Sequence, residues 1–301
     1  MASIGVKVIR SLFAAAEKVA PGLAGRAAFE LFCRTPNPRR LTDGERRAVN
    51  RAGQFMDDAR HHRLNVAGQS VVAHEFRPHA GHDNAGTVLV LHGWRSRTEY
   101  MKALIEAYRD AGFRVVSLDL PGHGASSGRR LTMVSAVRAV SVVAEWFGPF
   151  AAVVGHSFGG AVAFNSVAGS ITGIAPVAAS RLVLIAAPSS MPHLFRDFGR
   201  FLNLGPRTQY AVAEEVRRIA GRPLDDFNGS QLLAATPVPT LVVHAPDDRE
   251  VVAEHAELFA LAGDHVRLRW APGLGHRRIL SDPAIVAESL AFVSRPAVTV
   301  H

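Results

Sequence analysis

The sequence predicts an α/β protein in which a mostly parallel sheet is flanked by helices. Short apolar runs, each the length of one buried strand, alternate with helical stretches over most of the chain. Polar side chains of the types used in catalysis directly follow several of these runs, and the carboxyl ends of parallel strands share one edge of a sheet. One run, residues 151–156, passes through a glycine-rich turn into a helix. These patterns place a candidate site at the carboxyl edge of the sheet.

The composition is that of a soluble globular protein with a sizeable core: 301 residues, 48% hydrophobic and 20% charged. The net charge of +8 comes almost entirely from scattered arginines without a long basic block, so no nucleic-acid partner is expected. The single cysteine, Cys33, allows no disulfide within the chain and fits a reducing compartment. No apolar run reaches the roughly 18 residues of a membrane span, and Glu17 and Lys18 make the N-terminus a poor signal peptide. We therefore expect a cytoplasmic protein.

Residues 1–62 are expected to form an N-terminal helical extension without chemistry of its own. Apolar residues recur at helical spacing over residues 3–19, which predicts an amphipathic helix ending at Pro21-Gly22. This helix either packs on the main domain, which we favour, or contacts a membrane surface or a second copy of the chain. Thr42 and Glu45 have the spacing of a capping box, so a helix should begin there and run to about residue 60.

The main domain is expected over residues 63–301. A hairpin is predicted near residues 64–76, where apolar residues alternate with polar ones. Further strands are expected at residues 87–91, 113–118, 151–156, 181–186, 239–244 and 265–270. Helices are expected at residues 99–111, 131–147, 161–167, 251–261 and 283–293. Residues 188–235 interrupt this alternation with helical pieces, and we expect them to form a short lid.

The turn Gly155-His156-Ser157-Phe158-Gly159 has the form G-x-S-x-G of a nucleophile elbow. The glycines two residues before and two residues after the serine remove the bulk that such a strained turn cannot hold. The turn lifts the Ser157 hydroxyl clear of the sheet. It also places a helix N-terminus behind that hydroxyl, where developing negative charge is favoured. Ser157 is therefore the candidate nucleophile.

A serine hydroxyl is a weak nucleophile at neutral pH, so it needs a base that is itself oriented by an acid. His276 is the candidate base, because it follows the last strand in a glycine-rich loop that can bring it over the sheet. Asp247 and Asp248 both follow the preceding strand. We choose Asp248 as the acid because it lies nearer the next helix, and Asp247 could instead brace the turn.

From about residue 64 to the C-terminus, the chain resembles the α/β-hydrolase superfamily, in particular a serine esterase or lipase with a short lid. The order serine, aspartate, histidine is that of this family. The matching segments are His92-Gly93-Trp94, residues 119–126, residues 155–159, Asp247-Asp248 and Gly275-His276. The resemblance implies two backbone donors for an oxyanion, the N–H groups of Trp94 and Phe158. It gives Asp119 and His123 a structural role. We expect no metal ion and no cofactor.

The predicted activity is hydrolysis of a carboxylic ester through an acyl-enzyme on Ser157. The predicted substrate is a small-molecule ester with an apolar acyl or alcohol part. A thioesterase, an amidase or peptidase, a carbon–carbon bond hydrolase and a non-catalytic ligand-binding protein of the same fold remain alternatives. A serine nucleophile argues against haloalkane dehalogenases and epoxide hydrolases, which use aspartate. In the lid, Phe195, Phe198 and Phe201 are expected to border the substrate pocket, although they could instead pack the lid.

Overall fold

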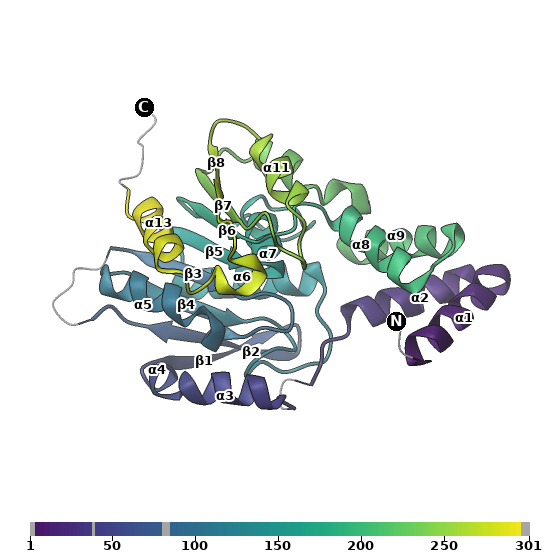
Figure 1. Cartoon of the computed structure of the whole chain (residues 1–301), viewed down its shortest axis with the longest axis horizontal. Coiled ribbons are helices and arrows are strands. Elements are labelled where there is room, and N and C mark those ends of the chain that lie inside the picture. Colours follow the sequence, from purple (N-terminus) through teal and green to yellow (C-terminus); the bar gives the residue numbers. More distant parts are fainter. Residues whose placement is uncertain (1–3, 38–39, 80–84, 296–301) are drawn as a thin grey trace. The chain divides into compact units, whose positions relative to one another are not determined.

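The structure is a computed structural model that describes residues 4–37, 40–79 and 85–295. The chain divides into two compact units (Figure 1). The first joins Met1–Arg34 to Ser190–Asn228, and the second comprises Thr35–Ser189 and Gly229–His301. Residues 35–62, which we expected to belong to the N-terminal extension, therefore lie in the same unit as the sheet.

The second unit is built on a single eight-stranded sheet with the order β1-β2-β4-β3-β5-β6-β7-β8. Its strands are β1 (Arg60–Val66), β2 (Gln69–Phe76), β3 (Thr87–Leu91), β4 (Arg114–Asp119), β5 (Ala152–His156), β6 (Leu182–Ile185), β7 (Thr240–His244) and β8 (Val266–Trp270). Strands β1 and β2 form the predicted hairpin, and β2 is antiparallel to β4. All pairs from β4 to β8 are parallel. The predicted mostly parallel sheet flanked by helices is therefore confirmed.

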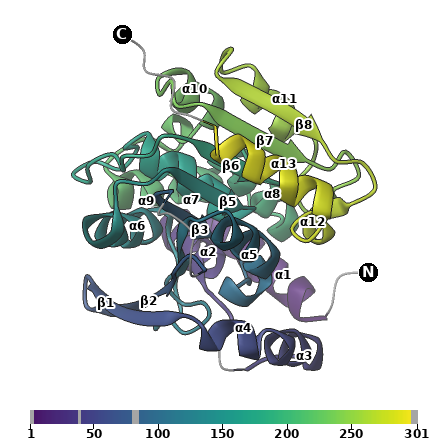
Figure 2. The same cartoon turned by 90° about the vertical axis from the view of Figure 1, so that its left-hand side faces the viewer.

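Helices cover both faces of this sheet, which explains why its central strands are apolar on both sides (Figure 2). The helices of this unit are α3 (Asp43–Arg51), α4 (Gly53–Asp57), α5 (Lys102–Asp110), α6 (Met133–Phe147), α7 (Phe158–Val167), α10 (Gly229–Ala234), α11 (Glu254–Ala260), α12 (Gly275–Arg278) and α13 (Pro283–Val293), with one 3-10 turn, η1 (Thr98–Met101). On one face, α5 and α13 share a hydrophobic core with the strands. The Tyr108 hydroxyl and the Ser289 hydroxyl, 2.6 Å apart, join these two helices. Helices α6, α7 and α11 cover the other face.

The capping box at Thr42 is present, but the helix that it begins is shorter than expected. The Thr42 hydroxyl accepts from the Glu45 N–H, and the Glu45 carboxylate accepts from the Thr42 N–H at 2.8 Å. Helix α3 ends at Arg51, and α4 is a separate short helix. Gly53 lies at the break, where its low helix propensity weakens a continuous helix. The chain then enters β1 at Arg60, the point where we expected the helix to end.

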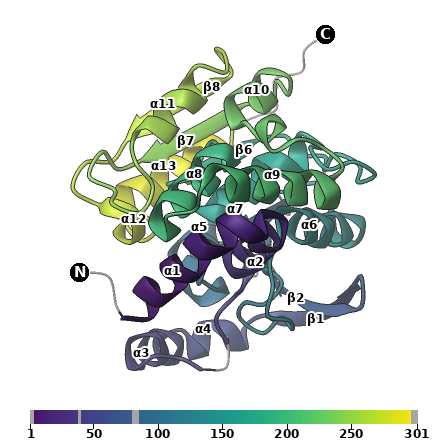
Figure 3. The same ribbon diagram turned by 90° about the vertical axis from the view of Figure 1, so that its right-hand side faces the viewer.

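The first unit is entirely helical (Figure 3). It contains α1 (Ile4–Val19), α2 (Pro21–Cys33), α8 (Met191–Leu202), α9 (Pro206–Ala220) and the 3-10 turn η2 (Leu224–Asp226). Helix α1 packs on α2 and on α8, a helix of the segment 188–235 that we expected to form a lid of the main domain. The Glu17 carboxylate of α1 accepts from the backbone N–H groups of Arg207 and Thr208, both at 2.9 Å, and so caps the N-terminus of α9.

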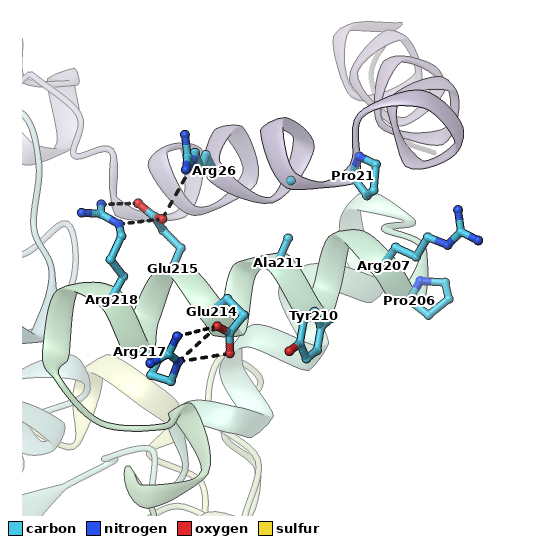
Figure 4. A pocket seen from close by; sticks show the side chains of 11 residues that line it. Pro21, Arg26, Pro206, Arg207, Tyr210, Ala211, Glu214, Glu215, Arg217 and Arg218 are labelled. Carbon is cyan, nitrogen blue, oxygen red and sulfur yellow. Dashed lines mark hydrogen bonds and ion pairs between the residues drawn. The ribbon is translucent and has the colours of Figure 1, made fainter.

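Helices α2 and α9 run side by side along a surface groove (Figure 4). The two glutamates of this groove pair with three of its four arginines. Arg217 bonds Glu214 at 2.9 Å, and Arg218 Nε bonds Glu215 at 3.0 Å. Arg26 of α2 lies 4.0 Å from Glu215 and so adds a second cation to that carboxylate. With four arginines against two glutamates, the groove lining keeps a net positive charge.

No helix among the described residues is both long enough and apolar enough to cross a membrane.

The approach of α2 to α9 depends on Gly25, which predicts the effect of adding a methyl group there. A Cβ on Gly25 would lie 2.4 Å from the Ala211 Cβ, whereas a Cβ on Gly22 would meet nothing within 4 Å. We expect Gly25→Ala to lower the free energy of unfolding by about 1–3 kcal/mol through overpacking, despite the better helix propensity of alanine. Urea unfolding and limited trypsin digestion would measure this. Gly22→Ala is the matched control, and equal stability of the two variants would contradict the close approach.

Candidate active site

Ser157 lies in the turn between β5 and α7 with a left-handed backbone, at φ 53° and ψ −126°. Such a conformation is uncommon for a residue other than glycine, and it persists only where the surrounding structure holds it in place. Here the Ser157 N–H donates to the Ile185 carbonyl of β6 at 2.8 Å, and the Ser157 carbonyl accepts from the Gly160 N–H at 2.9 Å. The serine side chain is held at the carboxyl edge of the sheet, where it stays partly exposed.

Two glycines allow this turn because backbone passes where their side chains would lie. A Cβ on Gly155 would be 2.4 Å from the Gly159 carbonyl oxygen. A Cβ on Gly159 would be 2.3 Å from the Leu91 carbonyl oxygen at the end of β3. Helix α7 therefore starts in close contact with both β5 and β3, as the sequence pattern predicts.

The loop after β3 brings Trp94 beside the serine turn. A Cβ on Gly93 would lie 2.9 Å from the Ser157 Cβ, so this loop passes directly over the serine. The Trp94 and Phe158 rings then meet edge to face with their centroids 5.7 Å apart. Neither the Trp94 N–H nor the Phe158 N–H donates to an acceptor within the described part of the chain. Two unused backbone donors thus flank Ser157.

His276 and Asp248 form the shortest contact between charged or titratable groups at this edge of the sheet. His276 Nδ1–H donates to Asp248 Oδ2 at 2.7 Å, and His276 is 9% exposed. Burial by itself would raise the pKa of the Asp248 carboxyl. The hydrogen bonds from His276 and from the Val251 and Glu250 N–H groups outweigh burial and hold that pKa below its ordinary value.

Asp247 has a different neighbour. Its Oδ1 accepts from the Gly273 N–H at 2.7 Å, in the loop that leads to His276. The geometry therefore separates the two adjacent aspartates: Asp248 contacts the imidazole, and Asp247 braces the loop that carries it.

A second set of buried polar groups fixes the loops around Trp94. His92 Nδ1–H donates to the Gly93 carbonyl at 2.8 Å, and His123 Nε2 accepts from the Arg95 N–H at 3.0 Å. Asp119 accepts from the N–H groups of Thr98 and Ala125. Burial would raise the pKa of Asp119, but the hydrogen bond from His74 and the N–H donors hold it well below its ordinary value.

His156, a residue of the elbow motif, also supports the candidate base, His276. Its Nε2–H donates to the His276 backbone carbonyl at 2.8 Å, and the two rings lie 4.8 Å apart. Burial lowers the pKa of His156 to about 3, and the neighbouring His276 contributes to the shift. Burial likewise lowers the pKa of His123 to about 4. The sequence signal for these histidines was their position next to strand ends, and it did not distinguish bracing from catalysis.

The structure brings Ser157, Trp94 and Phe158 together and pairs His276 with Asp248. The three phenylalanines that we expected to border the substrate pocket lie on α8 in the helical unit. The Phe195 ring stacks on Phe32 of α2 with centroids 4.3 Å apart, and Phe198 meets the same ring edge to face at 5.1 Å. Phe201 is more than half exposed and lies under the Arg10 guanidinium. Within the described residues, no group of His, Cys, Asp and Glu side chains could hold a metal ion.

Residues 88–289 match the model of a known family, described as the alpha/beta hydrolase family. The chain belongs to this family. The match covers the sheet from β3 onward and every residue of the candidate site, and it supports a hydrolase. The α/β hydrolase fold also explains why Ser157, Asp248 and His276 all follow strands of one parallel sheet.

Relatives of this α/β hydrolase include named esterases. A pimeloyl-[acyl-carrier protein] methyl ester esterase of Nitrosomonas europaea is 25% identical over 240 residues, which are 66% of this chain and 92% of that protein. The solved structure of Est1E from Butyrivibrio proteoclasticus with ferulic acid has a TM-score of 0.61 at 18% identity, covering 77% of this chain and 96% of that one. The solved structure of a membrane phospholipase A, described as a bacterial virulence factor, has a TM-score of 0.60 at 18% identity, covering 82% of this chain and 89% of that one. The two structures show the shared fold.

The buried histidines of this α/β hydrolase predict how its stability depends on pH. An unfolded chain protonates histidine near pH 6.5, whereas the folded protein keeps His156 and His123 neutral down to about pH 3 and pH 4. As the pH falls below 6.5, only the unfolded state takes up these protons, so the free energy of unfolding decreases. The loss is at most about 1.4 kcal/mol per pH unit for each ring. Asp119 and Asp248, whose pKa values are lowered from 3.8, add to the loss only below that pH.

Replacing His156 should therefore flatten the pH dependence. The His156→Gln variant keeps a side-chain N–H donor for the His276 carbonyl but no longer titrates. We expect it to lose less stability than the wild type between pH 6.5 and about pH 4, measured by urea unfolding across this range. His79→Gln removes an exposed histidine of the same unit and controls for the substitution itself. Identical slopes for the wild type and His156→Gln would mean that His156 is not held neutral by burial.

Proposed function

We propose that this α/β hydrolase cleaves a carboxylic ester through an acyl-enzyme on Ser157. The observation that carries the proposal is the 2.7 Å hydrogen bond between Asp248 and His276 Nδ1. It fixes the tautomer in which Nδ1 holds the proton and Nε2 has a free lone pair, which is the form that a general base for Ser157 requires. The low pKa of Asp248 keeps this carboxylate ionised, so that it stabilises the imidazolium when one forms.

The proposed reaction has two halves. The Ser157 oxygen attacks the ester carbonyl carbon while its proton passes to His276 Nε2, and the carbonyl oxygen becomes an oxyanion. His276 then gives the proton to the leaving alcohol oxygen as the carbon–oxygen bond breaks. A water molecule attacks the acyl-enzyme, with His276 taking its proton and returning one to Ser157. The carboxylic acid is then released.

The N–H groups of Trp94 and Phe158 are proposed as the oxyanion donors. Both lack an acceptor within the described chain and both adjoin Ser157, and the Phe158 N–H also lies at the N-terminus of α7. Donors fixed in this way stabilise charge that develops in the transition state without reorganising at that moment.

The relative named a methyl ester esterase favours an oxygen ester over the alternatives of the same fold. A thioester, an amide and a carbon–carbon bond can be attacked by the same groups, and they differ in the leaving group that His276 must protonate. A panel of an ester, the matching thioester and the matching anilide would rank these substrates directly.

Substitution of Ser157 and of Asp248 tests the proposed mechanism. We expect Ser157→Ala to abolish ester hydrolysis and labelling by a fluorophosphonate probe, because no oxygen nucleophile remains. We expect Asp248→Asn to lower kcat by about ten-thousandfold, because an amide favours the wrong imidazole tautomer. Asp247→Asn is the matched control and should cost far less, since Asp247 accepts from the Gly273 N–H and not from the imidazole.

Circular dichroism and thermal melting would confirm that each variant is folded. Wild-type turnover by folded Ser157→Ala would exclude the acyl-enzyme. A larger loss in Asp247→Asn than in Asp248→Asn would assign the acid to Asp247. An absence of both labelling and hydrolysis in the wild type would favour the non-catalytic ligand-binding alternative.

We also propose that α8 supplies apolar side chains to the substrate pocket. The segment begins directly after the end of β6, the strand beside β5, which leads into Ser157. Phe195 is buried against Phe29 and Phe32, so its main role is packing. Phe198 and Phe201 keep more exposed surface and are the better candidates for substrate contact.

A homologous series of esters separates these roles. We expect Phe198→Ala or Phe201→Ala to change kcat/KM unequally along the series, because each buried methylene contributes about 0.8 kcal/mol. Phe195→Ala is the comparison variant. It should lower the melting temperature and reduce kcat/KM by the same factor for every chain length. Uniform losses in all three variants would remove α8 from the pocket.

A further inference from the structure

Helix α1 has an apolar stripe on the side that faces away from the neighbouring helices. Val8, Leu12, Ala15 and Val19 are spaced by four, three and four residues and so share one face. Val8, Leu12 and Val19 are 54%, 65% and 84% exposed, and Ala15 is also exposed. The residues that turn toward the neighbouring helices, Ile9, Phe13 and Ala16, are only partly exposed. Unlike the scattered surface leucines and valines of most proteins, these side chains form a continuous row.

The charges beside this stripe all have the same sign. Lys7 and Lys18 lie on one flank of it, both are exposed, and neither forms an ion pair within the described residues. The only carboxylate of α1, Glu17, points the other way and caps α9. Arg10 also points inward, where its Nε–H donates to the Phe201 carbonyl at 2.8 Å. The outer face of α1 therefore combines apolar side chains with unpaired cations.

The helical unit as a whole also has an excess of positively charged residues. It contains eleven Lys and Arg residues against seven Asp and Glu residues. In the groove between α2 and α9, three arginines are matched by Glu214 and Glu215, whereas in the described part of the chain no carboxylate forms an ion pair with Lys7 or Lys18. The uncompensated positive charge of this unit thus includes the flank of the apolar stripe.

We propose that the outer face of α1 docks on the surface of a lipid bilayer that contains anionic lipids. A helix lying in the membrane interface buries a row of apolar side chains among the acyl chains. Its lysines extend along the helix so that their ammonium groups reach the headgroups. Helix α1 has 16 residues, including four charged ones, which suits a position along the surface rather than across the bilayer.

A second copy of the chain fits this face less well. Two α1 helices packed antiparallel about a two-fold axis would place Val8 of one copy opposite Val19 of the other. This pairing brings Lys7 of one copy beside Lys18 of the second copy, with no carboxylate on that flank to separate them. Like charges in such a position destabilise the pair, whereas anionic headgroups neutralise both lysines.

Vesicle sedimentation of the full chain tests the proposal. Phosphatidylcholine vesicles with and without phosphatidylglycerol are the probes. We expect strong sedimentation only with the anionic vesicles, and a decrease as sodium chloride is added. Leu12→Glu should abolish sedimentation. The Lys7→Gln/Lys18→Gln double variant should bind about 25-fold more weakly, from about fivefold for each lysine. Leu261→Glu, at a leucine 78% exposed in the other unit, is the matched control and should bind like the wild type.

Failure of the membrane proposal can be distinguished from failure of the proposed ester hydrolysis, on which it does not depend. Hydrolysis of a water-soluble short-chain ester should be the same in Leu12→Glu and in the wild type, because Leu12 is outside the candidate active site. Sedimentation unaffected by Leu12→Glu, or no preference for anionic vesicles, would overturn the proposal. A dimer in solution that Leu12→Glu dissociates, together with no vesicle binding, would assign the stripe to a second copy instead.

Discussion

The candidate site depends on the reversal of chain direction at Ser157. A residue with φ 53° must connect the end of β5 to the start of α7 while backbone from β3 passes within contact distance. This is possible only because Gly155 and Gly159 carry no side chains and because β6 accepts the serine N–H. The same packing sets the direction of the Phe158 N–H and the position of the loop that carries Trp94. One strained residue thus fixes the candidate nucleophile and both candidate oxyanion donors at once.

The loops around this turn are held by buried histidines and aspartates rather than by further apolar packing. His92 and His123 bond the backbone of the Trp94 loop, while His156 bonds the carbonyl of His276. Each is buried, and burial keeps His123 and His156 neutral, so each ring can donate from one nitrogen and accept at the other. A network of this kind rigidifies loops that have no regular hydrogen bonding of their own.

The sequence was sufficient to predict the sheet, its flanking helices and the residues at its carboxyl edge, because strand length, glycine spacing and the position of Ser157 are local properties. It also predicted the capping box at Thr42, which involves residues three apart. It could not predict that α1 and α2 pack with α8 and α9, since this pairing joins segments far apart in the chain. The end of α3 was misplaced because a helix terminated by Gly53 and a continuous amphipathic helix give similar patterns. The sequence favoured Asp248 over Asp247 only by its position, whereas the different contacts of the two aspartates involve loops that meet only in the folded protein.

The helical unit is discontinuous in sequence, and this affects how the chain can be made. Helices α1 and α2 leave the ribosome before α8 and α9, on which they pack, and about 150 residues separate the two pairs, on the order of ten seconds at ordinary rates of synthesis. During that interval the faces that carry Phe13, Phe29 and Phe32 have no partner, and the sheet must begin to form beside them. Helices α1 and α2 therefore reach their final packing only after residues that are made much later, and until then their apolar faces need protection from aggregation.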